Sequence, residues 1–274
     1  MVVNSSIALR GVDFTSAPSR RKPITVAHGR RDGEVVQLDA LCALESFAAF
    51  DAMLAEPGPW LGAFDFPFGL PREFVESLQL GADSDAVIAA LRRRCATRMA
   101  LRRLVDAWAA PRSAGQRLPH RRTDLALPGI ASTSPLQTRY VPVGFMYFEG
   151  LPRLVAADVH LPGLRGGDTR RSAVEGYPRW LSVELIGRRS YKNDASAARR
   201  AARADMLAAL EHGSPRLGLR LRLSAAQRAT LRDDASGDRL DAVLCLVQAA
   251  WAAVQPRHGQ PPLVDPVEGW IVTA

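Results

Sequence analysis

Carboxylates at the ends of apolar segments are the residues of this chain best placed to do chemistry. Asp13, Asp65 and Glu175 each end an apolar run (IALRGV, WLGAF and SAV) that predicts a buried strand. In open α/β sheets, ligands bind at the carboxyl ends of the strands. Carboxylates that converge there repel one another unless a cation lies between them. The cations that carboxylate oxygens prefer, such as Mg²⁺ or Mn²⁺, also support phosphoryl-transfer hydrolysis.

A fourth acidic segment, GDRLDAVLC, opens an apolar helix expected over residues 240–254. Asp238 and Asp241 are three positions apart, so both side chains lie on one face of that helix. Acidic residues here can also serve a structural role, because they cap the helix and interact with its positive end. Asp241 is the better metal ligand of the two, since an Asp238 that caps the helix is already engaged. Both remain candidates.

Each of the other candidates has an ordinary structural alternative. Asp13 precedes the turn-forming run TSAP and could cap that turn. Asp65 could accept N–H bonds from the loop at Gly69, although a charge buried among aromatic residues without a cation is costly. Glu175 could be a surface glutamate. Lys192, one of only two lysines, could orient a scissile phosphate or replace a cation, and the alternative is an exposed lysine.

The composition is that of a globular protein. The chain has 274 residues, of which 47% are hydrophobic and 23% are charged. No apolar run approaches the roughly 20 residues of a membrane span, and the first residues lack the pattern of a signal peptide. Cys42, Cys95 and Cys245 lie far apart in apolar stretches, which predicts reduced core residues. We therefore expect a cytoplasmic protein without a membrane partner. The five histidines show no zinc-binding spacing, and there is no P-loop.

The net charge of +8 suits a nucleic-acid partner, because neutralised phosphates release counterions. Of the 36 basic residues 34 are arginines, so codon composition of the source genome is a second explanation. Arg94, Arg98 and Arg102 share a polar face of a helical stretch expected over residues 85–110, and we predict that they contact nucleic acid. A solvated helix face is the alternative. The choice between DNA and RNA and the oligomeric state stay open.

The order of expected elements predicts an α/β fold. Strands are expected over residues 6–14, 22–27, 34–38, 60–66 and 172–175, and helices over 46–54, 85–110, 180–186, 195–210 and 240–254. Residues 141–158 form either a strand pair or a helix plus a strand. Residues 111–139 form a long functional loop or an exposed insertion.

This order fits a mixed five-stranded sheet with helices on both faces, its first three strands antiparallel and the others parallel. Such a sheet is the pattern of the ribonuclease-H-like fold. We predict one such domain over residues 1–274, with a helical and loop insertion at about 72–140.

Short motifs support this interpretation. They are GVDF at 11–14, DFPFGLP at 65–71, EGYP at 175–178, YK at 191–192, Asp238 with Asp241-Ala242, and EGW at 268–270. Together they resemble domain-of-unknown-function family 429, whose members are described as predicted nucleases with a ribonuclease-H-like fold. The resemblance implies that Asp13 bridges two metal ions and that a carboxylate from a late helix closes the site.

The sequence therefore predicts a Mg²⁺- or Mn²⁺-dependent nuclease with two ions about 4 Å apart. The predicted metal ligands are Asp13, Asp65, Glu175, Asp238 and Asp241, and Lys192 joins Asp13, Asp65, Glu175 and Asp241 as a catalytic residue. One alternative is a non-catalytic nucleic-acid-binding or scaffold protein, with carboxylates that are scattered or plugged by Arg or Lys. A less favoured alternative is an actin-like ATPase, which would need a glycine-rich phosphate loop.

Overall fold

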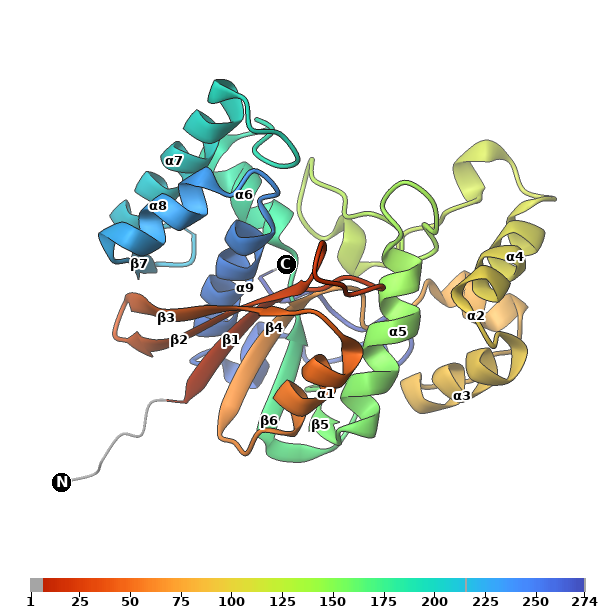
Figure 1. Cartoon of the computed structure of the whole chain (residues 1–274). Helices are drawn as coiled ribbons and strands as arrows, with labels where there is room; N and C mark the ends of the chain where they lie inside the picture. Colours follow the sequence, from red (N-terminus) through yellow and green to blue (C-terminus); the bar gives the residue numbers. More distant parts are fainter. Residues whose placement is uncertain (1–6, 215, 274) are drawn as a thin grey trace.

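A mixed sheet of seven strands organises the chain in the computed structural model, which describes residues 7–214 and 216–273 (Figure 1). The strand order is β5-β6-β4-β1-β2-β3-β7. β1, β2 and β3 form an antiparallel meander, whereas the β1–β4, β4–β6, β5–β6 and β3–β7 pairs are parallel. The strands are β1 Ala8–Asp13, β2 Ile24–Asp32, β3 Val35–Leu44, β4 Trp60–Asp65, β5 Val159–His160, β6 Asp168–Glu175 and β7 Arg220–Arg222.

The predicted α/β class and the antiparallel-then-parallel order are confirmed, but the prediction of five strands is wrong. The two additional strands, β5 and β7, have two and three residues and lie at the sheet edges. Such short segments contain too few alternations for a period of two to be recognised.

Helices fill the connections between the strands. They are α1 Phe47–Ala55, α2 Arg72–Ser77, α3 Ser84–Arg94, α4 Arg98–Ala109, α5 Val143–Ala156, α6 Pro178–Ile186, α7 Ala197–His212, α8 Ala225–Asp233 and α9 Asp238–Ala252, with 3₁₀ turns η1 Ala114–Gln116, η2 Thr123–Leu125 and η3 Pro256–Gly259. The helical stretch expected over 85–110 is two helices, because Thr97 starts a new one by accepting a hydrogen bond from Ala100 N (3.2 Å). Within residues 141–158, α5 runs through most of the range, so the strand pair is wrong and so is a strand at 154–158; the next strand, β5, begins at Val159.

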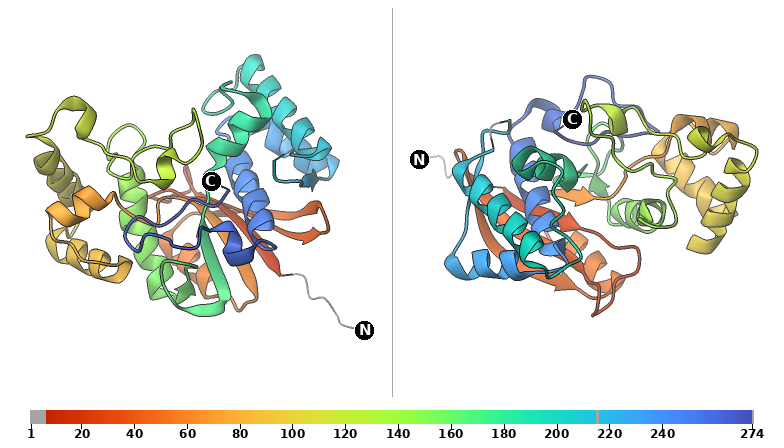
Figure 2. Two further views of the ribbon diagram at one scale, coloured as in Figure 1. Left: turned by 180° about the vertical axis from the view of Figure 1, so that it is seen from behind. Right: turned by 90° about the horizontal axis from the view of Figure 1, so that it is seen from above.

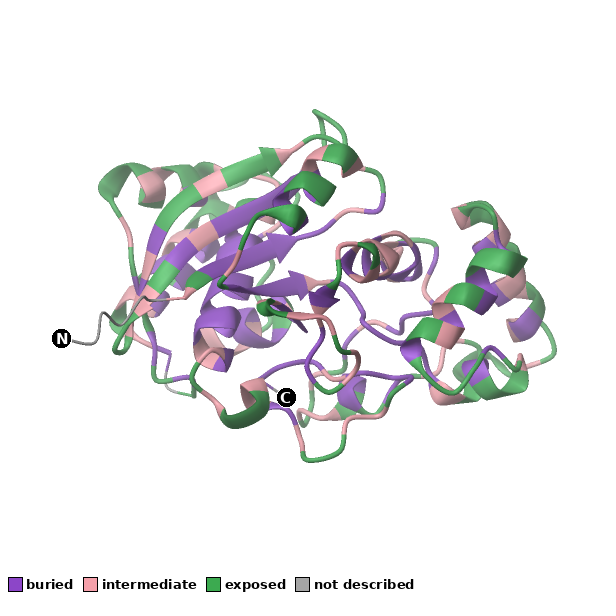
Figure 3. Ribbon diagram, turned by 90° about the horizontal axis from the view of Figure 1, so that it is seen from below, coloured by how far each residue is buried: buried purple, intermediate pink, exposed green. Residues whose placement is uncertain are grey.

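The sheet separates two hydrophobic cores. On one face, Val12 and Phe64 pack with Phe50 of α1 and Leu151 of α5. On the other face lies α9, which is buried nearly all round, as its sequence predicts, and which packs with α6 and α7 (Figure 2). Buried residues accordingly concentrate in the central strands, and exposed ones in the outer strands and helices (Figure 3).

The segment predicted as an insertion, 72–140, holds α2, α3 and α4, which lie beyond α5 on the side away from the sheet (Figure 1). Cys95 and Cys245 are buried as predicted, but the prediction is wrong for Cys42, which is exposed on β3. Within the two described ranges, no helix has the length and apolar character to cross a membrane.

Candidate metal centre

The ends of β1 and β4 bring Asp13 and Asp65 together. The two strands pair in parallel with Asp13 opposite Asp65, and each aspartate is the last residue of its strand. Side chains alternate between the faces of a sheet. Leu61 and Ala63 belong to the core on the α9 side, so Asp65, two residues further, points to that side as well.

A close contact between β1 and α9 adds Asp241. A Cβ atom at Gly11 would lie 2.0 Å from the Ala242 carbonyl oxygen and 2.1 Å from Leu246 N, so only glycine permits the helix to approach this strand. Asp241 belongs to the first turn of α9. The glycine of the GVDF motif therefore sets the distance at which Asp241 meets the end of β1.

The three carboxylates form one group. Asp13, Asp65 and Asp241 each offer an oxygen within 4.8 Å of the other two. Oxygens bound to one Mg²⁺ or Ca²⁺ lie at most about 4 to 5 Å apart, which is twice the metal–oxygen distance. Asp13 and Asp241 are buried and Asp65 is partly exposed. The group is therefore compact enough to hold a hard cation after small side-chain adjustments.

The structural alternatives for these aspartates can now be compared with the contacts. Among the residues that the structure describes, no hydrogen bond ends on the carboxylate of Asp13 or Asp65, so neither caps a turn nor accepts N–H bonds from the Gly69 loop. The N-cap of α9 is Gly237 rather than Asp238, which is the first residue of the helix. Buried polar groups usually have partners, and a pair of carboxylates that lack them needs an explanation.

Lys192 and Tyr191 supply polar contacts to this group. The Lys192 ammonium donates to Asp241 Oδ2, and the Tyr191 hydroxyl donates to Asp241 Oδ1. Lys192 Nζ also lies 4.0 Å from Asp238 Oδ1. The lysine side chain keeps 32% of its surface exposed, so it sits at the rim of the group. This is the lysine predicted to orient a phosphate or to replace a cation.

Arg203 of α7 holds the loop that carries these two residues. Its side chain is buried and donates to the carbonyl oxygens of Tyr191 (2.7 Å) and Arg232 (2.7 Å). Sequence reasoning missed this residue, because nothing in an arginine-rich helix distinguishes a buried arginine from a solvated one. Arg203 therefore positions Lys192 indirectly, through the backbone of the loop.

The electrostatics follow from this crowding. Burial raises the pKa of Asp65 to about 7, and the negative charge of Asp241 adds to the shift. Burial likewise raises the pKa of Asp13, with Lys192 opposing and Asp241 reinforcing the shift. Burial lowers the pKa of Lys192, but the charges of Asp241 and Asp13 outweigh it, so the net shift is upward. The lysine is therefore a protonated ammonium, and its single positive charge does not fully compensate the negative charges of the neighbouring carboxylates.

Glu175 lies outside the group of three, on the opposite face of the sheet. It pairs with Phe64 across β4 and β6, and Ala173 shares the core of Phe64, whereas Val174 belongs to the α9 side. Within the sheet Glu175 therefore points to the face opposite Asp65, although both residues line one small pocket beyond the strand ends. Glu175 is buried, so the alternative of a surface glutamate is wrong. Its oxygens accept bonds from Arg121 at 2.6 and 2.8 Å.

Arg121 is the centre of this second network. Its guanidinium also donates to Asp124 Oδ1 (2.8 Å) and to the carbonyl oxygen of Glu268 (2.9 Å). The Glu268 carboxylate in turn accepts from the backbone N–H groups of Arg72 (3.0 Å) and Arg122 (2.9 Å). The EGW motif thus ties the insertion to the end of the chain. Arg121 and Asp124 were not predicted, since no spacing marks them among so many arginines and aspartates.

The three arginines predicted to contact nucleic acid differ in their surroundings. Arg94 is exposed at the end of α3. Arg98 donates to the Ser16 carbonyl oxygen (2.7 Å), and Arg102 donates to the Thr138 carbonyl oxygen. Two of the three guanidinium groups are thus bonded within the protein, where they attach α4 to neighbouring loops.

Comparisons with known proteins place these motifs in a family. A search of curated proteins and a search of solved structures each gave no significant match. A family model described as "Protein of unknown function (DUF429)" matches residues 11–268, from the glycine of GVDF to the glutamate of EGW. This match confirms the resemblance inferred from the motifs. The chain therefore belongs to the DUF429 family of proteins of unknown function.

Proposed function

We propose that this protein is a divalent-metal-dependent phosphodiesterase that hydrolyses nucleic acid. The observation that carries the proposal is the convergence of Asp13, Asp65 and Asp241, each with an oxygen within 4.8 Å of the others. The order β3-β2-β1-β4, with an antiparallel meander followed by a parallel strand, supports a ribonuclease-H-like fold for the same region. In such sheets the carboxyl ends of the strands are the usual place for ligands.

The charges of the group fit a divalent cation. When all are ionised, three carboxylates and the Lys192 ammonium leave two uncompensated negative charges. One Mg²⁺ or Mn²⁺ would neutralise them, and both ions prefer carboxylate oxygens. A thiol or imidazole ligand is not needed. The donor set therefore favours a hard cation over zinc or copper.

The chain's own residues then have distinct roles. A bound cation would polarise a phosphoryl oxygen and lower the pKa of a water molecule. Asp13, Asp65 and Asp241 would hold that cation at the carboxyl ends of β1 and β4, and Tyr191 fixes the orientation of Asp241 through its hydroxyl. Lys192 at the rim can bind a non-bridging oxygen of the phosphate, where charge develops during the reaction. This arrangement favours one cation plus a lysine over the two cations predicted from the sequence.

A second function is favoured by one specific contact. The ion pair between Lys192 and Asp241 is what a plugged, non-catalytic site would contain. In that case the lysine is a permanent counter-charge and the protein binds nucleic acid without cleaving it. The two functions differ in two measurable properties, which are the binding of a divalent cation and the cleavage of nucleic acid.

The test combines a crystal soaked in Mn²⁺, with the ion located by anomalous scattering, and a cleavage assay on single-stranded DNA, duplex DNA and RNA. We expect a peak between Asp13, Asp65 and Asp241, and Mn²⁺-dependent cleavage that Asp13→Asn abolishes. Asparagine keeps the shape of the side chain but removes its charge. Absence of both the peak and the cleavage would contradict the proposal and favour the plugged site.

A further inference from the structure

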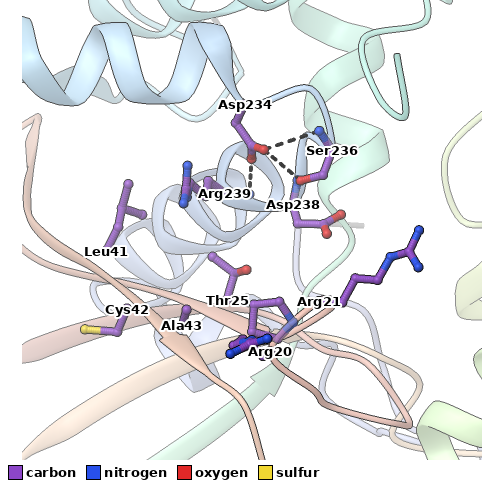
Figure 4. A pocket seen from close by; sticks show the side chains of 11 residues that line it. Arg20, Arg21, Thr25, Leu41, Cys42, Ala43, Asp234, Ser236, Asp238 and Arg239 are labelled. Atoms are coloured by element: carbon purple, nitrogen blue, oxygen red, sulfur yellow. Dashed lines mark hydrogen bonds between the residues drawn. The ribbon is translucent and has the colours of Figure 1, made fainter. Parts of the chain in front are cut away.

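A pocket of about 400 Å³ lies beside the candidate metal centre. Its walls are the loop between β1 and β2, the carboxyl end of β3, and the start of α9 with the segment before it (Figure 4). Two of the residues that line the pocket are neighbours of residues in the metal centre. Thr25 pairs with Asp13 across β1 and β2, and Asp238 lies 4.0 Å from the Lys192 ammonium. A ligand in the pocket would thus be a neighbour of one bound at the carboxylates.

Three arginines give this pocket its positive charge. Arg20 and Arg21 come from the loop after β1, and Arg239 comes from α9, on the other side of the pocket (Figure 4). All three residues are exposed. Within residues 7–214 and 216–273, none of their guanidinium groups has an ion pair or hydrogen bond, whereas nearby Arg200 and Arg232 both pair with Asp233. The three groups are therefore available to an anion.

The remaining walls combine apolar surface with carboxylates that are already engaged. Leu41 and Ala43 of β3 offer apolar surface at the base of the pocket. Asp234 accepts bonds from the Ser236 hydroxyl (2.8 Å) and from Arg239 N (3.2 Å). Asp238 faces the lysine, as described above. Both carboxylates keep their negative charge, so the three arginines leave the pocket walls with a net charge of +1, and an apolar group can lie against β3.

We propose that this pocket binds one nucleotide unit of a single polynucleotide strand, next to the phosphodiester at the metal centre. Phosphates of this unit and of its neighbours along the strand would be bound by Arg20, Arg21 and Arg239, since guanidinium groups bind phosphate oxygens. The three arginines lie around the pocket rather than at one point (Figure 4). The base or sugar of the unit would lie against Leu41 and Ala43. The volume is within the range of small-ligand sites, and a base enclosed in a pocket must be unpaired. The position of the scissile bond rests on the proposed function, but binding in the pocket does not.

The test measures binding without cleavage. A fluorescently labelled single-stranded oligonucleotide, as DNA and as RNA, is titrated with the full chain in EDTA at several salt concentrations. The pocket variant is Arg20→Gln/Arg21→Gln/Arg239→Gln. The control is Arg93→Gln/Arg103→Gln/Arg222→Gln, which removes the same charge from exposed positions of α3, α4 and β7.

We expect the pocket variant to weaken binding at least tenfold and to reduce the salt slope by up to about 2, at ~0.7 for each lost phosphate contact. The control should change affinity by less than about threefold, and a mononucleotide should compete better than inorganic phosphate. Mn²⁺ binding by the pocket variant should equal that of wild type, and a thermal melt that matches wild type shows that the variant is folded. The single variant Arg239→Gln provides a milder version of the same test.

The outcomes separate the two proposals. If both triple variants weaken binding equally, or if wild type does not bind, the pocket proposal is overturned. If wild type cleaves nucleic acid and the pocket variant binds the oligonucleotide as tightly as wild type does, the pocket proposal is overturned and the proposed function is left intact. If only the pocket variant loses oligonucleotide binding, and wild type takes up no Mn²⁺, the pocket proposal is supported and the proposed function is refuted. Equal competition by inorganic phosphate would overturn the nucleotide assignment.

Discussion

Two groups of carboxylates lie near the carboxyl ends of β4 and β6, on opposite faces of the sheet, and they differ in how their charge is compensated. Around Arg121, the carboxylates of Glu175 and Asp124 both accept short bonds from one guanidinium, and all three side chains are at most 3% exposed. Around Lys192, the ammonium contacts Asp241. Among the described residues, the carboxylates of Asp13 and Asp65 accept no hydrogen bond.

The comparison shows that compensation, rather than acidity, separates a structural carboxylate from a candidate ligand. Buried ions that are paired and fully hydrogen-bonded can be retained as part of the fold. A buried group of like charges that lacks partners destabilises the protein, and such arrangements concentrate at functional sites. Glu175 shares an acidic motif with the other candidates, yet its surroundings place it in the first class. Asp13 and Asp65 belong to the second.

The largest expected effect comes from breaking the compensated group. Arg121→Met removes the only guanidinium that the structure shows between Glu175 and Asp124, and it leaves two buried carboxylates unpaired. We expect a loss of about 3 to 5 kcal/mol in the free energy of unfolding, measured by urea denaturation. Arg103→Met, at an exposed position of α4, is the control and should change stability by less than about 0.5 kcal/mol. A loss at Arg121 as small as that of the control would contradict a structural role for this network.

The second effect has the opposite sign and depends on pH. The pKa of Asp65 is raised from 3.8 to about 7 in the folded protein, so the folded state holds this proton more tightly than the unfolded state. The stability that this provides is fully present below pH 4 and is lost as pH rises to about 7. Asp65→Asn mimics the protonated carboxyl and avoids this loss. In EDTA the variant should therefore match wild type near pH 4 and exceed it near pH 8, by up to about 4 kcal/mol.

The measurement is urea denaturation of both proteins in EDTA at several pH values, so that other titrating groups cancel in the difference. The same pair is then compared with Mn²⁺, which stabilises a protein that binds it by about 2.7 kcal/mol at a hundred times Kd. This stabilisation should be absent in Asp65→Asn. Equal Mn²⁺-dependent shifts in the two proteins would show that Asp65 is not a ligand.

The third prediction concerns Lys192, whose positive charge both compensates Asp241 and repels a cation nearby. Lys192→Gln should bind Mn²⁺ about tenfold more tightly, which corresponds to ~1.4 kcal/mol, yet it should cleave more slowly because the contact to the phosphate is lost. Mn²⁺ affinity can be measured by calorimetry. Lys22→Gln, which changes the other lysine at an exposed position, is the matched control. Unchanged Mn²⁺ affinity in Lys192→Gln would show that the lysine does not share the site of the cation.

The positions of Asp13, Asp65 and Asp241 show what could be predicted from the sequence. Each depends on local patterns, namely a carboxylate at the end of an apolar strand or in the first turn of an apolar helix. Parallel strands align their carboxyl ends, so local patterns were enough to bring Asp13 and Asp65 together. The antiparallel meander of β1, β2 and β3 was also predictable from local patterns, namely consecutive strand-like segments separated by turn residues.

The face on which Glu175 lies could not be predicted in this way. A shift of one residue in register moves a side chain to the other face of a sheet. The sequence shows that a strand ends at Glu175, but only its pairing with Phe64 decides that it points away from Asp65. The roles of Arg121 and Arg203 depend on contacts between distant segments, and the arginine-rich composition hides them.

The smallest expected effect tests whether the two groups are independent. Glu175→Gln keeps the size of the side chain and one oxygen that can accept the bond from Arg121 or from Phe68 N. Because the Glu175 carboxylate is paired with Arg121 and lies outside the group of three, Mn²⁺ affinity should change by less than about threefold, or ~0.6 kcal/mol. Asp241→Asn, which alters a member of the group, should weaken Mn²⁺ binding by far more. Calorimetry on both variants, with thermal melts as a check of folding, decides the matter. A loss of Mn²⁺ binding in Glu175→Gln as large as that in Asp241→Asn would mean that the carboxylate rotates to join the metal, and that the two groups function as one site.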